Sequence, residues 1–273
     1  MDDAGVWTWR TRVHIYDLDS LGHVNNANYF PYLQQATEEA FPAAGVWQLQ
    51  HLSMEYITPA LHGAGLAIHV WIEDTDKDGA SLGYAVEREE DQQVLLRARL
   101  VWETADGGTP ALPGAPAGLP TTLPRDYQIR PARPVDELPG SRQFRWRHRV
   151  RGYEAGRNGE VSAAHVLRWT EEARAGAALE VGWSYQRMGE ADFVAVVIRH
   201  EFDFRRMPRP GDDVEIVSQI CEMRRVRGAW RHDVFCNGEL VAAARVSGGF
   251  LNSAGQPHPP PAALIDRLLG RIT

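Results

Sequence analysis

The chain has 273 residues, enough for two domains of ordinary size, and its 44% hydrophobic and 24% charged content is that of a globular protein. A formal net charge of −7 argues against nucleic acid as a partner, and the absence of an apolar run of roughly 18 residues argues against a membrane span. The N-terminus lacks the basic and then apolar pattern of a signal peptide, so we expect a cytoplasmic protein. Cys221 and Cys236 have no partners at metal-ligand spacing, and we expect no metal site.

The first 104 residues predict one long helix among strands. Residues 7–16 alternate in polarity as a strand does, and about 27–43 show a helical pattern closed by Pro42 and Gly45. Alternating apolar residues then recur in several runs between residues 52 and 102, with turn residues between the runs. One helix combined with antiparallel strands is an α+β layout. The apolar face of the predicted helix comprises Tyr29, Leu33, Ala36 and Ala40.

A proline-rich stretch follows this first set of elements. Eight of the chain's 17 prolines lie between residues 104 and 140, interleaved with glycine, alanine and threonine. Such a composition is typical of a linker or of a connection that follows the surface. We therefore assign 105–142 as a linker between an N-terminal domain, 1–104, and a C-terminal domain, 143–273.

The second half of the chain repeats the first at a shift of 137 residues. Eleven of the 37 positions from 9 to 45 are identical after this shift, and Gly22, for example, falls on Gly159. Alternating apolar runs return between 194 and 251, and the tail after Pro261 predicts a short added helix. The sequence therefore predicts a tandem duplication of one α+β unit.

The residues that the two copies do not share are the reactive ones. In the first copy, Asp17, Asp19 and His23 precede the polar step Asn25-Asn26, at which the helix begins. Free backbone N–H groups at a helix start can polarise a carbonyl or hold an anion, so this arrangement predicts a catalytic site. The second copy keeps the scaffold and loses the reactive groups, which predicts a single site. Its residues at the five positions are Glu154, Gly156, Glu160, Ser162 and Ala163.

The stretch I-Y-D-L-D-S-L-G-H-V-N-N-A-N-Y-F, which contains these residues, resembles the signature of hotdog-fold thioesterases of the 4-hydroxybenzoyl-CoA type and of their acyl-ACP relatives. The resemblance implies an α+β fold of two tandem hotdog domains, each a long helix wrapped by an antiparallel sheet, that form an intramolecular pseudo-dimer. It also implies hydrolysis of acyl-CoA or acyl-ACP thioesters. Coenzyme A or phosphopantetheine would then be part of the substrate, and no other cofactor would be needed.

The resemblance also implies roles for individual residues. The family's catalytic aspartate, a nucleophile or general base, matches Asp19, and the backbone N–H that polarises the thioester carbonyl matches Asn26. His23 matches the catalytic histidine of the acyl-ACP branch. We also place Asn25 and Tyr29 at the substrate. The structural alternatives are a helix cap for the asparagines, a core position for Tyr29 and a structural role for His23.

This chain departs from the acyl-ACP branch at two points. Leu21 stands where that branch has an asparagine, and Thr58-Pro59 stand where it has a further acidic or cysteine residue. The simpler site centred on an aspartate is therefore the better match.

A second match lies in the other half, at Arg224, Arg225 and Arg227, which resemble a segment that binds coenzyme A phosphates in the hydroxybenzoyl-CoA enzymes. Guanidinium groups suit phosphates because they bind them bidentately. The arginines could instead be a solvated hairpin or pair with the acidic residues of the first copy, Glu73, Asp74, Asp76 and Asp78.

Two other functions remain as alternatives at this stage. A non-catalytic double hotdog could bind acyl thioesters or act as a scaffold, and a hotdog hydratase or dehydratase could act on the same carrier. The intact Asp19 favours an enzyme over a scaffold, and the H-V-N-N step at residues 23–26 speaks against a hydratase or dehydratase. The expected partners are a small acyl thioester, an acyl carrier protein as a candidate carrier and, in a further oligomer, other copies of the chain.

Overall fold

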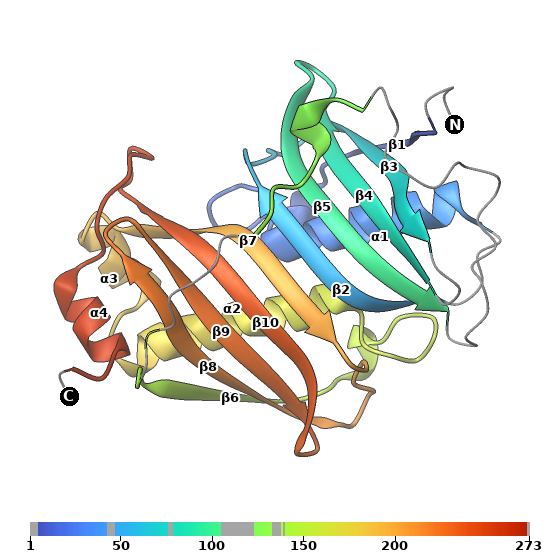
Figure 1. Cartoon of the computed structure of the whole chain (residues 1–273). Helices are drawn as coiled ribbons and strands as arrows, with labels where there is room; N and C mark the ends of the chain where they lie inside the picture. Colours follow the sequence, from blue (N-terminus) through green and yellow to red (C-terminus); the bar gives the residue numbers. More distant parts are fainter. Residues whose placement is uncertain are drawn as a thin grey trace. The chain divides into compact units, whose positions relative to one another are not determined.

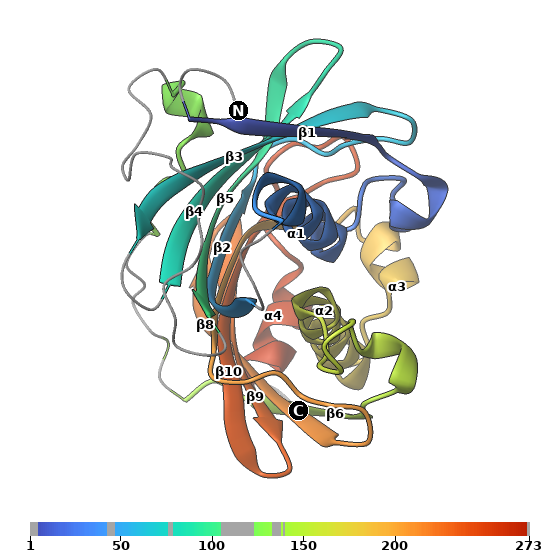
Figure 2. The ribbon, with the colours of Figure 1, turned by 90° about the vertical axis from the view of Figure 1, so that its right-hand side faces the viewer.

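The computed structural model describes residues 5–42, 47–75, 79–104, 123–132, 138 and 140–271. They form two compact units, and the division falls between residues 131 and 132. In each unit a five-stranded antiparallel sheet curves around one long helix (Figures 1 and 2). The predicted α+β layout is confirmed.

Unit 1 places its sheet strands in the order β1-β3-β4-β5-β2. The helix is shorter than predicted, because its first turn is a 3₁₀ helix, η2, and Phe41 caps its end. The first strand also ends earlier than predicted, at Arg12, since the following residues turn into the 3₁₀ helix η1. The elements are β1 (Trp7–Arg12), η1 (Ile15–Asp17), η2 (Asn26–Asn28), α1 (Tyr29–Ala40), β2 (Trp47–Tyr56), β3 (Gly65–Thr75), β4 (Gly79–Arg88), β5 (Gln93–Thr104) and η3 (Arg125–Tyr127).

Unit 2 has the same strand order when β6 to β10 are matched with β1 to β5. The predicted duplication is therefore a duplication of topology as well as of sequence. Unit 2 adds the short helix α3, which the sequence did not suggest, and the expected helix after Pro261. Its elements are β6 (Gln143–Arg149), η4 (Gly152–Glu154), α2 (Ala163–Glu180), α3 (Tyr185–Glu190), β7 (Val194–Phe204), β8 (Asp213–Arg224), β9 (Arg227–Cys236), β10 (Glu239–Leu251) and α4 (Ala262–Leu268).

The core of unit 1 lies between α1 and the concave face of its sheet. All four residues of the predicted apolar helix face are buried, as are the alternating residues Leu66, Ile68 and Val70 of β3. Burial of one large aliphatic side chain contributes about 1.5–3 kcal/mol, so this layer supplies much of the stability of the unit. The predicted helix face is confirmed.

Part of the predicted linker packs against the opposite face of the same sheet. Leu123 and Tyr127 form a cluster with Trp71 and Ala85, and the Tyr127 hydroxyl donates to a Glu87 carboxylate oxygen at 2.6 Å. Gly83 is required here, because a Cβ at this position would lie 2.3 Å from the Trp71 ring. Residues 123–131 thus follow the surface of unit 1 as a strap anchored by Leu123 and Tyr127, which is the second of the two expectations for this stretch, whereas 105–122, 133–137 and 139 lie outside the described residues.

The core of unit 2 contains polar side chains where that of unit 1 is mainly apolar. Ser218 and His232 pair across β8 and β9 at the register where Val70 and Tyr84 pair across β3 and β4. The Ser218 hydroxyl and His232 Nδ1 lie 2.8 Å apart, and both side chains are buried. Burial, with added repulsion from the Arg174 charge and from His200, holds the pKa of His232 well below its ordinary value of 6.5.

The depressed pKa of His232 predicts that the folded protein is less stable at low pH. The unfolded chain binds a proton at His232 near pH 6.5 and the folded chain does not, so the free energy of unfolding falls as the pH drops below about 6.5. We expect the double variant Ser218→Val/His232→Tyr, which copies the pair in unit 1, to lose less stability between pH 7 and pH 5 than the wild type. Urea denaturation at the two pH values measures this, and equal losses would contradict it.

Candidate functional site

The candidate site is built on a tight loop before the helix of unit 1. The Asp19 N–H donates to the His23 carbonyl oxygen at 2.7 Å, and the Gly22 N–H donates to the Asp19 carbonyl oxygen at 3.0 Å. Gly22 has a φ of +77°, a conformation that glycine adopts at little cost. Asp19 Oδ1 accepts from the N–H groups of Leu21 at 2.8 Å and of His23 at 3.2 Å. The carboxylate is therefore held in place, and its residue is half-buried.

The second copy forms the same turn without a carboxylate at the position of Asp19. The N–H of Gly156 donates to the Glu160 carbonyl oxygen at 2.7 Å, and the N–H of Gly159 donates to the Gly156 carbonyl oxygen at 3.0 Å. Gly159 also has a φ of +77°. The same backbone turn therefore forms with glycine in place of Asp19. There Asn158 Oδ1 accepts from the Glu160 N–H at 3.1 Å, as Asp19 Oδ1 does from the His23 N–H, so the turn needs a side-chain acceptor but not a carboxylate at this position.

Asp17, in contrast to Asp19, connects the loop to the helix of unit 1. Asp17 Oδ2 accepts from the His14 N–H at 2.8 Å and from the Tyr32 hydroxyl at 2.7 Å, so it ties the loop to α1. Its counterpart Glu154 accepts from the Arg151 N–H at 2.6 Å and from Trp169 Nε1 at 2.9 Å, with Trp169 at the position of Tyr32. Both copies retain this carboxylate because it is structural.

Glu154 Oε2 also accepts a hydrogen bond from His148 Nε2, at 2.8 Å. Burial by itself would raise the pKa of Glu154, but the hydrogen bonds from Arg151, His148 and Trp169 outweigh burial and lower the pKa. The carboxylate thus stays ionised and holds the loop of unit 2 to α2.

The helix start offers one free amide. Asn25 Oδ1 accepts from the Ala27 N–H at 3.0 Å, so Asn25 is the N-cap of η2. The Asn26 carbonyl oxygen accepts from the Tyr56 hydroxyl at 3.0 Å, which fixes the first turn to the end of β2. Among the described residues the Asn26 N–H has no hydrogen-bond acceptor, as is usual for a first-turn amide. This N–H is available to a ligand.

His23 and Tyr29 differ in accessibility. His23 is half-buried, its backbone pairs with Leu61, and its ring makes no hydrogen bond to a described residue. Tyr29 is only 2% exposed, and its hydroxyl accepts from the Ala60 N–H at 3.2 Å. Burial raises the pKa of Tyr29 to about 12, and the Asp19 charge adds to the rise. Tyr29 is therefore a core residue that holds the loop after β2, close enough to Asp19 to sense its charge.

The three predicted phosphate-binding arginines lie on the β8–β9 hairpin of unit 2. Arg224 ends β8, Arg225 is in the turn and Arg227 begins β9. Arg224 Nε donates to Glu222 Oε1 at 2.6 Å, and Arg245 lies 3.5 Å from the same carboxylate. The side chains of Arg224 and Arg225 are exposed. All predicted site residues other than these arginines lie in unit 1, on the Asp19 loop and at the start of its helix. They are Asp19, His23, Asn25, Asn26 and Tyr29.

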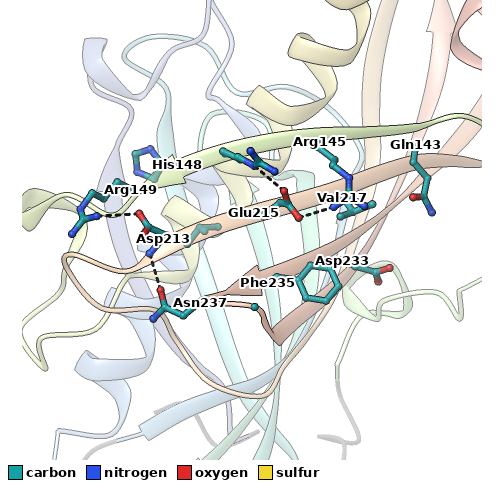
Figure 3. Close-up of a pocket in the computed structure, with 13 residues that line it drawn as sticks. Gln143, Arg145, His148, Arg149, Asp213, Glu215, Val217, Asp233, Phe235 and Asn237 are labelled. Atoms are coloured by element: carbon teal, nitrogen blue, oxygen red, sulfur yellow. Dashed lines mark hydrogen bonds and ion pairs between the residues drawn. The ribbon is translucent and has the colours of Figure 1, made fainter.

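Unit 2 also has an open hollow of about 760 Å³ over β6, β8 and β9 that the sequence did not suggest (Figure 3). Arg145 and Arg147 pair with Glu215, and Arg149 pairs with Asp213. The alternating arginines of β6 were the only signal for it. The lining charges are balanced, and the His148 side chain lies on the other side of β6 (Figure 3), so the hollow has no catalytic grouping.

Metal-ligand clusters and membrane spans are absent from the described part of the chain. No three His, Cys, Asp or Glu side chains of the described residues are grouped to hold a metal ion. No helix among those residues is long and apolar enough to cross a membrane.

Each half of the chain matches a model of a known protein family. Residues 6–104 match the acyl-ACP thioesterase C-terminal domain, and residues 158–243 match the thioesterase superfamily. Both halves are thioesterase domains. The predicted family resemblance is confirmed. No curated protein sequence matches the chain.

Solved structures agree with this tandem thioesterase at the level of the fold. A putative oleoyl thioesterase from Lactobacillus plantarum has 14% identity and a TM-score of 0.72, and the match covers 92% of this chain and 99% of that one. An acyl-ACP thioesterase from Bacteroides thetaiotaomicron has 15% identity and a TM-score of 0.67, covering 91% and 99%. The 12:0-ACP thioesterase from Umbellularia californica has 10% identity and a TM-score of 0.64, covering 89% and 93%. The predicted pair of tandem hotdog domains is confirmed as the fold.

The contrast between the two carboxylates gives a stability prediction for this thioesterase. Asp17→Ala removes a charged acceptor from the hydrogen bond that joins the loop to Tyr32 of α1 and from one within the loop, and we expect a loss of about 1.5–3 kcal/mol in the free energy of unfolding. Asp19→Ala removes an acceptor from two amides of the loop itself but no bond to α1, and we expect a smaller loss, of about 1 kcal/mol. Urea denaturation of both variants measures the difference, and equal losses would refute the division of roles.

Proposed function

We propose that this chain hydrolyses acyl thioesters at the Asp19 loop, with Asp19, His23 and Asn26 as the reacting group of residues. One observation carries the proposal: unit 2 forms the same backbone turn with Gly156 and with the Asn158 amide oxygen as acceptor, so the turn itself does not require a carboxylate at the position of Asp19. The membership of both halves in thioesterase families supports the reaction type.

The Asn26 N–H would bind the thioester carbonyl oxygen and stabilise the charge that develops on it. One such preorganised donor typically lowers the barrier by about 2.7–4 kcal/mol. The Tyr56 hydroxyl, bound to the Asn26 carbonyl oxygen, keeps this peptide in place. The donor therefore needs little rearrangement when the substrate arrives.

Asp19 would supply either the base or the nucleophile. As a base it takes a proton from water, the water oxygen bonds to the carbonyl carbon, the C–S bond breaks, and the proton passes to the departing thiolate. As a nucleophile it forms a mixed anhydride and expels the thiolate, and water then hydrolyses the anhydride. The backbone N–H of His23 donates to Asp19 Oδ1, and the His23 ring would orient the water or the carboxylate. Neither route needs a cofactor.

The carrier would be coenzyme A or an acyl carrier protein, which share the phosphopantetheine arm. Arg225 and Arg227 would contact its phosphates, because a guanidinium binds phosphate with two parallel hydrogen bonds. The Bacteroides thetaiotaomicron and Umbellularia californica structures are named as thioesterases of acyl-ACP, which supports acyl carrier protein as a partner.

The central test is thiol release from acyl-CoA and acyl-ACP substrates. We expect Asp19→Ala to reduce kcat/KM by at least about a hundredfold, the scale of a lost general base or nucleophile. Glu160→Ala, which changes the residue of unit 2 that corresponds to His23, is the matched control and should keep wild-type activity. Rapid quenching followed by mass spectrometry would detect acylated Asp19 only on the nucleophilic route.

Two results would count against this proposal. Equal thiol release by the wild type and Asp19→Ala would remove Asp19 from the mechanism. If neither carrier supports turnover, the chain would be a non-catalytic protein that binds acyl thioesters.

The arginines make a separate prediction about the carrier. We expect Arg225→Ala and Arg227→Ala to raise the KM for acyl-CoA several-fold, since each removes a phosphate contact, and to leave the KM for an acyl-pantetheine without phosphate unchanged. Arg147→Ala, also an exposed arginine of unit 2, is the control. Equal effects on both substrates would show that the arginines act on the fold rather than on phosphate.

A further inference from the structure

Large apolar side chains surround the Asp19 loop on the surface of unit 1. Isolated exposed apolar residues are common, but several gathered at one place mark a binding surface. We call this group the apolar rim. It comprises Ile15, Tyr16, Leu21, Ile57 and Leu61, which are 66%, 83%, 56%, 43% and 52% exposed.

Hydrogen bonds hold the three segments of the apolar rim together. Leu61 pairs with His23 as an isolated bridge, and the Ala60 carbonyl oxygen accepts from the Val24 N–H at 2.9 Å. On the other side, the Gly63 N–H donates to the Val13 carbonyl oxygen at 3.1 Å. The segment after β2 therefore lies between the segment before η1 and the Asp19 loop. The apolar side chains are displayed by a fixed backbone, next to the candidate reacting residues.

Unit 2 forms the same backbone without the apolar rim. The Val161 N–H donates to the Pro208 carbonyl oxygen at 2.8 Å, as Val24 does to Ala60, so that Arg209 occupies the position of Leu61. The N–H of Arg205 donates to Val241, as that of Ile57 does to Leu95. By the shift of 137, Gly152 and Asn158 replace Ile15 and Leu21, and only the tyrosine is kept, as Tyr153. The apolar rim is thus not required by the fold and occurs in the copy that carries Asp19.

We propose that the apolar rim binds the aliphatic acyl chain of the thioester substrate, and that Leu21 and Leu61 determine specificity for long acyl chains. This inference rests on the proposed function, because Asp19 then marks the carbonyl carbon to which the acyl chain is attached. The acyl chain begins at that carbon and is wholly apolar, whereas the pantetheine arm carries two amides. A surface of five apolar side chains therefore matches the acyl side of the thioester and not the carrier side.

The test compares long and short acyl groups on the same carrier. We expect Leu21→Ser and Leu61→Asn each to lower kcat/KM for a decanoyl thioester about tenfold, the scale of one lost leucine contact, and for an acetyl thioester less than about twofold. Leu179→Asn on α2 is the matched control, because Leu179 is 57% exposed, and it should change neither value. Equal losses for both acyl groups, or no loss for either, would overturn the proposal.

A binding measurement separates this proposal from the proposed function. S-decyl-pantetheine and S-ethyl-pantetheine are thioethers that cannot be hydrolysed, and calorimetry gives their affinities for the whole chain. We expect the decyl compound to bind more tightly to the wild type and to lose that advantage in Leu61→Asn, while Asp19→Ala retains it. If the wild type lacks turnover but shows this pattern, the proposed hydrolysis fails and the apolar rim stands.

Two outcomes of these measurements would overturn the acyl-chain assignment. One is equal affinity of the wild type for the two thioethers. The other is a self-associated wild type that Leu61→Asn converts to monomer in sedimentation velocity, which would assign the apolar rim to contact between copies of the chain.

Discussion

Each unit depends on one carboxylate that fastens the incoming loop to its long helix. Asp17 accepts from a loop amide and from the Tyr32 hydroxyl, and Glu154 accepts from a loop amide and from the indole of Trp169. A charged acceptor that joins two elements is costly to leave unpaired, so this contact restricts the loop to one position. The turn that carries Asp19 and the helix start at Asn26 follow Asp17 directly in the chain. The contact of Asp17 with α1 therefore fixes their positions.

The duplication separates what the fold needs from what the chemistry needs. Unit 2 keeps the carboxylate that fastens the loop, the glycine with positive φ and the helix. It lacks counterparts of the Asp19 carboxylate, of His23 and of most of the apolar rim. Its core has also exchanged the Val70–Tyr84 pair for Ser218 and His232. These polar groups in the interior of unit 2 cost some stability at low pH, since buried neutral histidines oppose folding in acid.

The sequence was sufficient for the features that repeat locally. Helical and alternating periodicities predicted the buried faces of α1 and of the strands, and the shift of 137 predicted the shared topology. Of the site, the N-cap role of Asn25 was readable, because asparagine before a helix usually caps it. The buried hydroxyl contact of Tyr29 with Ala60 and the free N–H of Asn26 depend on residues distant in sequence and on backbone geometry, which periodicity does not encode. The resemblance already pointed to Asp19 rather than Asp17, but the structural role of Asp17 depends on its partner Tyr32, as that of Glu154 depends on Trp169, and the sequence does not show these contacts.

The strap of unit 1 has a consequence for where the polypeptide can be divided. Sequence homology ends the first domain at residue 104, yet Leu123 and Tyr127 cover Trp71 and Ala85 on the convex side of the sheet. A fragment cut at residue 104 would expose that indole and its neighbours to solvent and invite association between fragments. The first domain as a physical object therefore extends to about residue 131, beyond the segment that homology recognises.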